Sequence, residues 1–209
     1  AYKDFQILGT FFSQQNGITS YCAHSALCMI VNNMSAERFQ VPYREITPEI
    51  VNEEMIEINK NLKAIPDEGL STDQIRGFLE EYGLKIAEIR FADFPNEEYS
   101  EWIYNYLESG YPVLLIFETQ AVSHVITILG HTFNSDSWRP EAHISYIEIK
   151  DIQRRMVFDD LEKYRLLYNR ASQWVGDFII HDDNFGMYQT MPLDTFKKTE
   201  LVGKNWTLL

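Results

Sequence analysis

The hydrophobic pattern of this chain changes its period near residue 109, and this change constrains the fold more than any other feature. Before that point, apolar side chains recur mainly at helical spacing. After it, apolar runs over 112–117, 123–130 and 174–181 predict buried strands. Helices followed by strands indicate an α+β fold. For 209 residues we expect one domain with two lobes, 1–108 mainly helical and 109–209 mainly sheet, with an insertion at about 132–172.

Capping residues mark the ends of the expected helices. The first helix is expected from Cys22 to about Asn33, and Thr47-Pro48-Glu49 starts a second that continues to about residue 62. Residues 71–74 form a Ser-Thr-Asp-Gln capping box for a third helix, which ends near residue 82 before a glycine.

The segments that follow mix both periods. Residues 85–91 alternate like a strand, and a fourth helix is expected between Asn96 and Gly110. Within the insertion we expect a strand over 144–149 and a helix over about 159–169. The inward face of the fourth helix is expected to carry Trp102, Ile103, Tyr106 and Leu107.

Composition excludes several classes of partner. A net charge of -13 and a pI near 4.8 argue against nucleic acid and anionic membranes, which attract clustered Lys and Arg. The sequence contains no run of eighteen apolar residues, so we expect no membrane-spanning helix. The acidic surface favours basic substrates or partners.

The two cysteines, Cys22 and Cys28, are six residues apart on one predicted helix, a spacing that does not fit a disulfide. Free thiols favour a reducing compartment, so we expect a cytoplasmic location. The chain begins at Ala1 rather than Met, which leaves open that it is part of a longer protein or complex.

The strongest chemical signal is the segment QQNGITSYCAHSAL, in which Cys22 opens the first predicted helix. A thiol at a helix N-terminus is favoured as the thiolate, because unpaired N–H groups and the helix dipole stabilise negative charge. A nucleophilic thiolate also needs a base and an oxyanion donor. His124, at the start of a predicted strand, is the candidate base, and Gln15 or Gln14 is the candidate donor.

A third group is needed to orient the histidine. Asp182 and Asp183 follow an apolar strand, and either carboxylate can accept the N–H of His124. We expect no metal and no cofactor, because His181-Asp182-Asp183 has no companion ligands at a recognisable spacing. His131 is expected to face away from His124, seven residues along the same strand. His24, His131, His143 and His181 are weaker candidates for the base than His124.

These motifs resemble the papain-like cysteine peptidase superfamily, and are most similar to its bacterial branches, such as double-glycine leader peptidases and phytochelatin synthases. The resemblance covers roughly residues 10–35 and 109–190. It is carried by four motifs in order, namely Gln…YCAHSAL, GYPVLLIF, SHVITILG and DFIIHDDNFG. It implies a helical lobe that carries the cysteine, and an antiparallel sheet lobe that carries histidine and Asp or Asn.

By position, the resemblance implies Cys22 as nucleophile, His124 as base and Asp182 or Asp183 as orienting acid. The family's glutamine stands six residues before the cysteine, where this chain has Asn16, so Asn16 joins Gln14 and Gln15 as an alternative oxyanion donor.

The implied function is a cysteine peptidase-type hydrolase that cleaves a peptide or isopeptide bond through a thioester acyl-enzyme. Two alternatives are a transpeptidase or deamidase with the same triad, and an inactive papain-like binding module.

Overall fold

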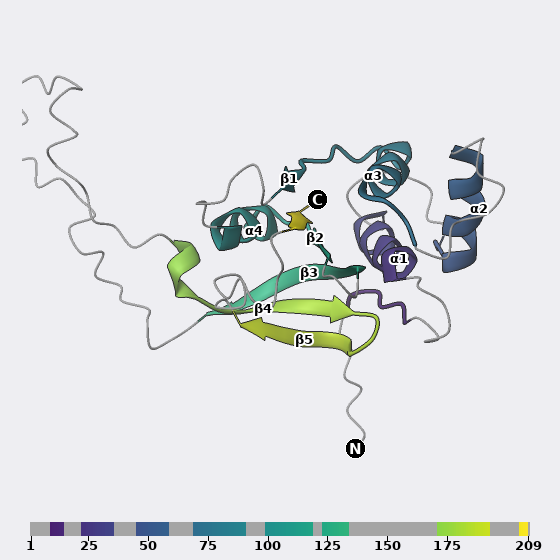
Figure 1. Ribbon diagram of the computed structural model, residues 1–209. Helices are drawn as coiled ribbons and strands as arrows, with labels where there is room; N and C mark the ends of the chain where they lie inside the picture. Colours follow the sequence, from purple (N-terminus) through teal and green to yellow (C-terminus); the bar gives the residue numbers. More distant parts are fainter. Residues whose placement is uncertain are drawn as a thin grey trace, which may run out of the picture.

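The computed structural model describes residues 9–14, 22–35, 45–58, 69–90, 99–118, 123–133, 171–192 and 205–208 (Figure 1). The helices in these ranges are α1 (Cys22–Ser35), α2 (Pro48–Ile58), α3 (Thr72–Glu81) and α4 (Tyr99–Glu108), together with the short 3₁₀ helix η2 (Ala171–Trp174). The strands are β1 (Ile89–Arg90), β2 (Val113–Glu118), β3 (Ser123–Phe133), β4 (Val175–Asp182), β5 (Gly186–Pro192) and β6 (Asn205–Leu208).

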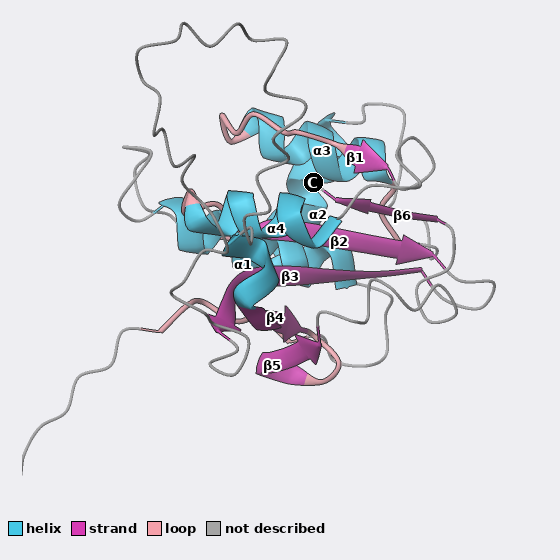
Figure 2. Cartoon of the chain, turned by 90° about the vertical axis from the view of Figure 1, so that its left-hand side faces the viewer, coloured by secondary structure: helices cyan, strands magenta, loops and turns pink. Residues whose placement is uncertain are grey.

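The strands form one antiparallel sheet in the order β1-β6-β2-β3-β4-β5, which Figure 2 shows from top to bottom. The combination of helices with an antiparallel sheet is the α+β class that the sequence predicts. β2, β3 and β4 are neighbours in space as well as in sequence, although 37 residues outside the described ranges separate β3 from η2. The beginning of β3 and the end of β4 consequently lie at the same end of the sheet.

Alternating side chains of β2 enter two different hydrophobic cores. Leu114 and Ile116 pack with α1, α2 and α3, whereas Val113 and Leu115 pack with α4 and with β4. Successive residues of a strand point to opposite faces, so the three-helix group and α4 cover opposite faces of the sheet. Figure 1 shows α1, α2 and α3 gathered together and α4 apart from them.

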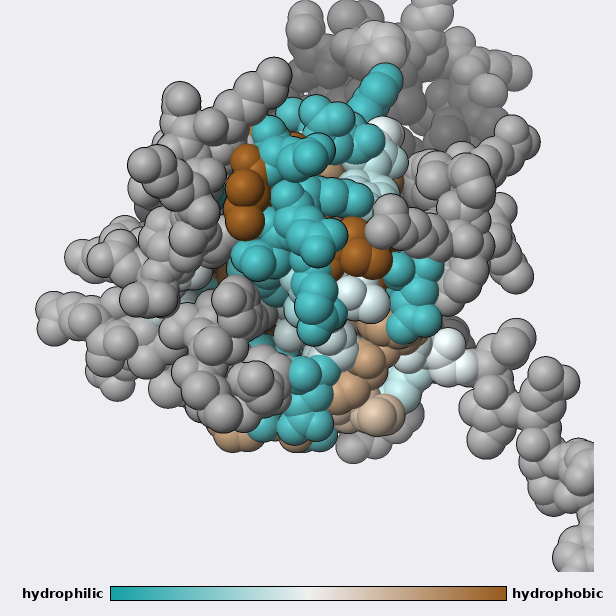
Figure 3. Space-filling view, turned by 90° about the vertical axis from the view of Figure 1, so that its right-hand side faces the viewer, coloured by the Kyte–Doolittle hydropathy of each residue, from teal (hydrophilic) through white to brown (hydrophobic). Residues whose placement is uncertain are grey.

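Helix α2 is the outer member of its group. It buries Val51 and Met55, one turn apart, and exposes Glu49, Glu53 and Glu57. Figure 3 views this side of the molecule, which is mostly hydrophilic with small, separate hydrophobic areas. Within the described ranges, no helix has the length and apolar character needed to cross a lipid bilayer.

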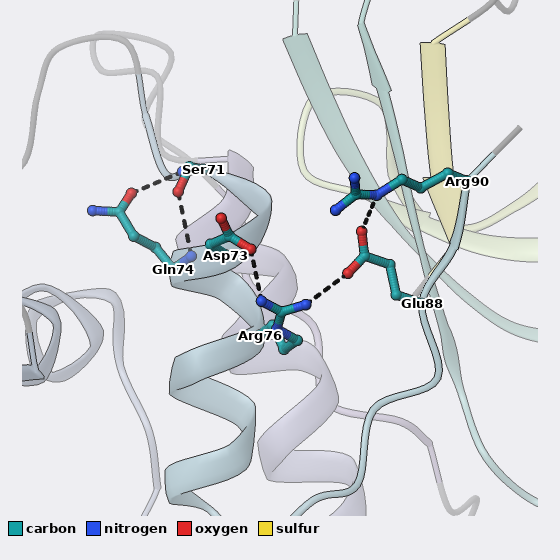
Figure 4. Close-up of polar contacts among 6 residues, drawn as sticks. All are labelled: Ser71, Asp73, Gln74, Arg76, Glu88 and Arg90. Carbon is teal, nitrogen blue, oxygen red and sulfur yellow. Dashed lines mark hydrogen bonds and ion pairs between the residues drawn. The ribbon is translucent and has the colours of Figure 1, made fainter. Parts of the chain in front are cut away.

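The capping box of α3 is present as predicted (Figure 4). The Ser71 hydroxyl accepts the Gln74 N–H at 3.3 Å, and the Gln74 side chain accepts the Ser71 N–H at 2.8 Å. Gly83 ends this helix with a positive φ of 77°, the left-handed conformation that the sequence predicts for its C-terminal stop.

Some expected elements differ from the observed ones. Of the strand expected over 85–91, the described residues 85–90 form a strand only at Ile89–Arg90, which pairs with Leu208 and Thr207 of β6. On α4, Tyr99 and Ile103 are buried, but Trp102 is 37% exposed, so its predicted inward position is wrong. Residues 59–62, 144–149 and 159–169, for which a helix end, a strand and a helix are expected, lie outside the described residues.

One buried amide ties α1 to the segment that leads into α2. The Asn32 amide donates to the Ile46 carbonyl at 2.8 Å and accepts the Ile46 N–H at 2.8 Å, and both residues are buried. Asn32→Ala leaves these two backbone groups without their partner, so we expect it to lower the free energy of unfolding by about 3 kcal/mol in urea denaturation. The exposed control Glu53→Ala is expected to change it by less than about 0.5 kcal/mol. An equal loss of unfolding free energy in both variants would contradict the stabilising role of the Asn32 amide.

Candidate active site

The geometry of the sheet brings His124 next to Asp182. Thr127 pairs with His181, so Asp182 lies opposite Ile126 and diagonally across from His124, on the same face. The His124 Nε2 atom is 3.2 Å from the Asp182 Oδ2 atom, and both side chains are 92% buried. Of the two aspartates left open by the sequence, Asp182 is the one that hydrogen bonds to His124.

The other oxygen of Asp182 holds the turn between β4 and β5. Its Oδ1 atom accepts the N–H of Asn184 at 2.8 Å and the N–H of Phe185 at 3.2 Å. Gly186 then begins β5 at a φ of 118°, which favours glycine. The carboxylate therefore cannot rotate without losing turn contacts, and its Oδ2 atom is fixed in the direction of His124.

Cys22 lies near enough to His124 for its thiol to favour the protonated imidazole. Cys22 is the first residue of α1 and is partly exposed. Since Nε2 of His124 bonds to Asp182, Nδ1 is the ring nitrogen left for the thiol. The ring is also packed edge-on against Phe117, with a centroid distance of 5.4 Å.

The electrostatics of the pair favour a protonated imidazole. Burial alone lowers the pKa of His124, but the hydrogen bonds and negative charges of Asp182 and Cys22 outweigh it and raise this pKa to about 10. For Asp182, burial opposes ionisation. The hydrogen bond from His124 and the two turn N–H groups still bring the pKa of this carboxyl below its ordinary value.

Asp183 differs from Asp182 in its burial, its hydrogen bonding and the direction of its pKa shift. Its side chain is fully buried, 3.7 Å from Nε2 of His124, and neither oxygen has a hydrogen-bond partner among the described residues. Burial raises the pKa of Asp183, although the nearby His124 charge acts in the opposite direction. This carboxyl is positioned beside the histidine without holding it.

The segment before the cysteine is anchored at residues 9–14. The Asn33 side chain accepts the Phe11 N–H at 2.5 Å and donates to the Phe11 carbonyl at 3.2 Å. The Thr10 N–H donates to the Tyr188 hydroxyl at 2.7 Å. Gln14 is exposed at the end of this segment, whereas Gln15 and Asn16 lie outside the described residues. Asn33 and Tyr188 carry no sequence signal for this anchoring role, so sequence reasoning missed them.

The remaining cysteine and histidines lie elsewhere. Cys28 is buried, and burial, with a smaller contribution from Glu49, raises the pKa of its thiol to about 12. Burial lowers the pKa of His24 to about 4. His181 lies on the opposite face of β4 from Asp182. On that face its Nε2 atom is 3.3 Å from the Thr10 hydroxyl. His143 lies outside the described residues.

His131 lies on the same face of the sheet as His124, so the prediction that it faces away is wrong. The pairing of β3 with β4 shifts by one residue between Ile128 and Gly130. The shift turns His131 toward α4, where its Nε2 atom bonds to Glu108 at 2.8 Å.

His124 and the two aspartates beside it have the composition of a cation site. One ligand atom each from His124, Asp182 and Asp183 lies within 4.8 Å of the others. The sequence spacing did not reveal this grouping, because it is formed across two strands. However, Nε2 of His124 and both oxygens of Asp182 already have hydrogen-bond partners within the protein, so a cation would have to displace the contact between them.

Comparison with protein-family models, with curated proteins and with solved structures finds no match for this chain. The functional argument therefore depends on the contacts of Cys22, His124 and Asp182.

Replacing the Asp182 carboxylate by an amide tests the role of its two oxygens. In Asp182→Asn the amide oxygen is expected to keep the turn N–H groups, which places the NH₂ group against Nε2 of His124. Nε2 must then accept a hydrogen bond from this NH₂ group, so the proton of the neutral ring moves to Nδ1. With that proton, Nδ1 cannot accept a proton from the thiol. We expect the pKa of His124, measured by NMR titration of the imidazole, to fall by more than about one unit.

Asp183→Asn is the matched control, because it keeps the hydrogen bond between His124 and Asp182. It is expected to shift the His124 titration less than Asp182→Asn does. A larger shift in Asp183→Asn would reverse the assignment of the two aspartates.

Proposed function

We propose that this protein is a thiol-dependent acyl-transfer enzyme, a cysteine peptidase-type hydrolase with Cys22 as nucleophile, His124 as base and Asp182 as the orienting acid. The observation that carries the proposal is the hydrogen bond between the buried imidazole of His124 and Asp182, beside Cys22, which helps to raise the pKa of that imidazole. A nucleophile, a base and a group that orients the base form the arrangement on which nucleophilic catalysis depends.

In the proposed reaction, Cys22 starts as the thiolate, with its proton held on Nδ1 of His124, and the sulfur attacks an amide carbonyl carbon. The oxyanion accepts hydrogen bonds from the Cys22 N–H and from an amide side chain, for which Gln15 is the first candidate and Gln14 and Asn16 are the alternatives. As the C–N bond breaks, Nδ1 returns its proton to the leaving amine. Water then attacks the thioester, which releases the acid and restores the thiol.

The substrate class follows from the chemistry and the charge. The thioester route cleaves a peptide or isopeptide bond, and the net charge of -13 favours substrates with basic residues near that bond. A transpeptidase or a deamidase would use the same three residues. A transpeptidase would differ in its acyl acceptor, and a deamidase in the amide that it attacks. An inactive binding module would keep the fold without a reactive thiolate.

The reactivity of Cys22 toward iodoacetamide gives the first test. The positive charge that His124 retains at neutral pH stabilises a neighbouring thiolate, so we expect Cys22 to be alkylated well below pH 8.5, the approximate pKa of a free cysteine. Removing the imidazole in His124→Ala should lower the rate at pH 6.5 by at least about tenfold. Mass spectrometry of the labelled peptides measures both rates.

Cys28 is the internal control, because its buried thiol with a pKa near 12 should react only after unfolding. Chelator treatment should leave the rate for Cys22 unchanged, whereas a rise would mean that a cation occupies the His124 cluster. An ordinary alkylation profile for Cys22, unaffected by His124→Ala, would favour the inactive binding module.

Turnover gives the second test. A peptide library with Lys and Arg at all positions, incubated with wild-type protein and with Cys22→Ala, should yield cleavage only with wild type. Cys28→Ala should retain full activity, since Cys28 is buried in the core away from His124. Cleavage that persists in Cys22→Ala would exclude the thiol mechanism.

A further inference from the structure

A cavity lies beside the C-terminal half of α1, away from Cys22. It is a cavity of about 380 Å³ between α1, α3, α4, residues 83–89 and the start of β2. Ile30 and Met34 reach it from α1, eight and twelve residues after Cys22, which is roughly 12 and 18 Å along the helix axis. The cavity is therefore separate from the proposed catalytic thiol.

The walls of this cavity are mostly apolar. α3, α4 and β2 contribute Leu79, Ile103 and Val113, and the extended segment after α3 contributes Ile86. An apolar lining of this kind favours the apolar part of a ligand. A volume near 380 Å³ is also within the range typical of small-molecule sites.

Lys85 is the one charged residue among the described residues that line the cavity, and its side chain is exposed. The other two basic residues in the described ranges are ion-paired. Arg76 binds Asp73 at 2.7 Å and Glu88 at 2.9 Å, and Arg90 binds Glu88 (Figure 4). Lys85 has no ion pair within those ranges, so its charge is available to a ligand.

We propose that this cavity binds an aliphatic monocarboxylate, with the hydrocarbon chain between α1, α3 and α4 and the carboxylate beside Lys85. The apolar walls select the chain, and the single cation selects an anionic head group on a protein whose net charge otherwise repels anions. This site does not depend on the proposed function.

A series of saturated fatty acids with eight to fourteen carbons, each below its micelle concentration, tests the chain-binding part. Affinity measured by isothermal titration calorimetry should rise about fourfold per added methylene until the cavity is full, and then level off. The primary alcohol of the same length should bind more weakly than the acid. Lys85→Met should weaken acid binding about two- to fivefold and leave alcohol binding unchanged.

Ala87→Trp tests the location, because Ala87 is exposed and lines the cavity, so the indole should block it and abolish binding. Thr190→Trp, at an exposed position on β5, should bind like wild type. Cys22→Ala should also bind like wild type, so loss of catalysis and loss of this site are distinguishable. Circular dichroism checks that each variant is folded.

The proposal is overturned if no acid of the series binds, which would mean that the cavity is closed or filled by the chain itself. Equal affinity for acid and alcohol in wild type would exclude the carboxylate and leave a neutral apolar ligand. Unchanged binding in Ala87→Trp would place the ligand elsewhere. If that variant does not fold, the comparison of acid and alcohol in Lys85→Met still decides.

Discussion

The hydrogen bonding of the Asp182 carboxylate joins the fold to the candidate site. One oxygen closes the turn between β4 and β5, and the other fixes the imidazole of His124. The contact with His124 is made in a buried environment, where charge-assisted hydrogen bonds are strong and an unpaired carboxylate is costly. The histidine is thus oriented by a carboxylate that two N–H groups of the turn hold in place.

The thiol is positioned by the contacts of α1. The helix packs on β3, and near its end Asn33 holds the backbone of Phe11. Tyr188 adopts a φ of 52°, an uncommon conformation for a residue with a side chain, and its hydroxyl binds Thr10. The segment at 9–14 is in this way attached both to α1 and to β5. It links the helix that carries Cys22 to the hairpin that carries Asp182.

Local signals in the sequence were sufficient for the elements but not for their partners. The helix starts at Thr47-Pro48 and Ser71 follow from capping chemistry, and the helix from Cys22 follows from its apolar spacing. The apolar runs at 112–117 and 123–130 correspond to β2 and β3. β5 and β6 were missed. β5 exposes most of its side chains and therefore lacks a hydrophobic pattern, and β6 has only four residues. Trp102 was assigned to the inner face of α4 by hydrophobicity alone, although helix packing placed Tyr99 there instead.

The choice between Asp182 and Asp183 shows where sequence reasoning ends. Both residues are aspartates after the same strand, so composition and local pattern cannot separate them. What separates them is the register of β4 on β3, which places every second residue of β4 on the face of His124 and turns Asp183 into the hairpin. The one-residue shift beyond Ile128 shows how sensitive that outcome is, because it was enough to reverse the face of His131. The residue types of a triad can therefore be identified from the chain, whereas their pairing depends on a register that only long-range contacts determine.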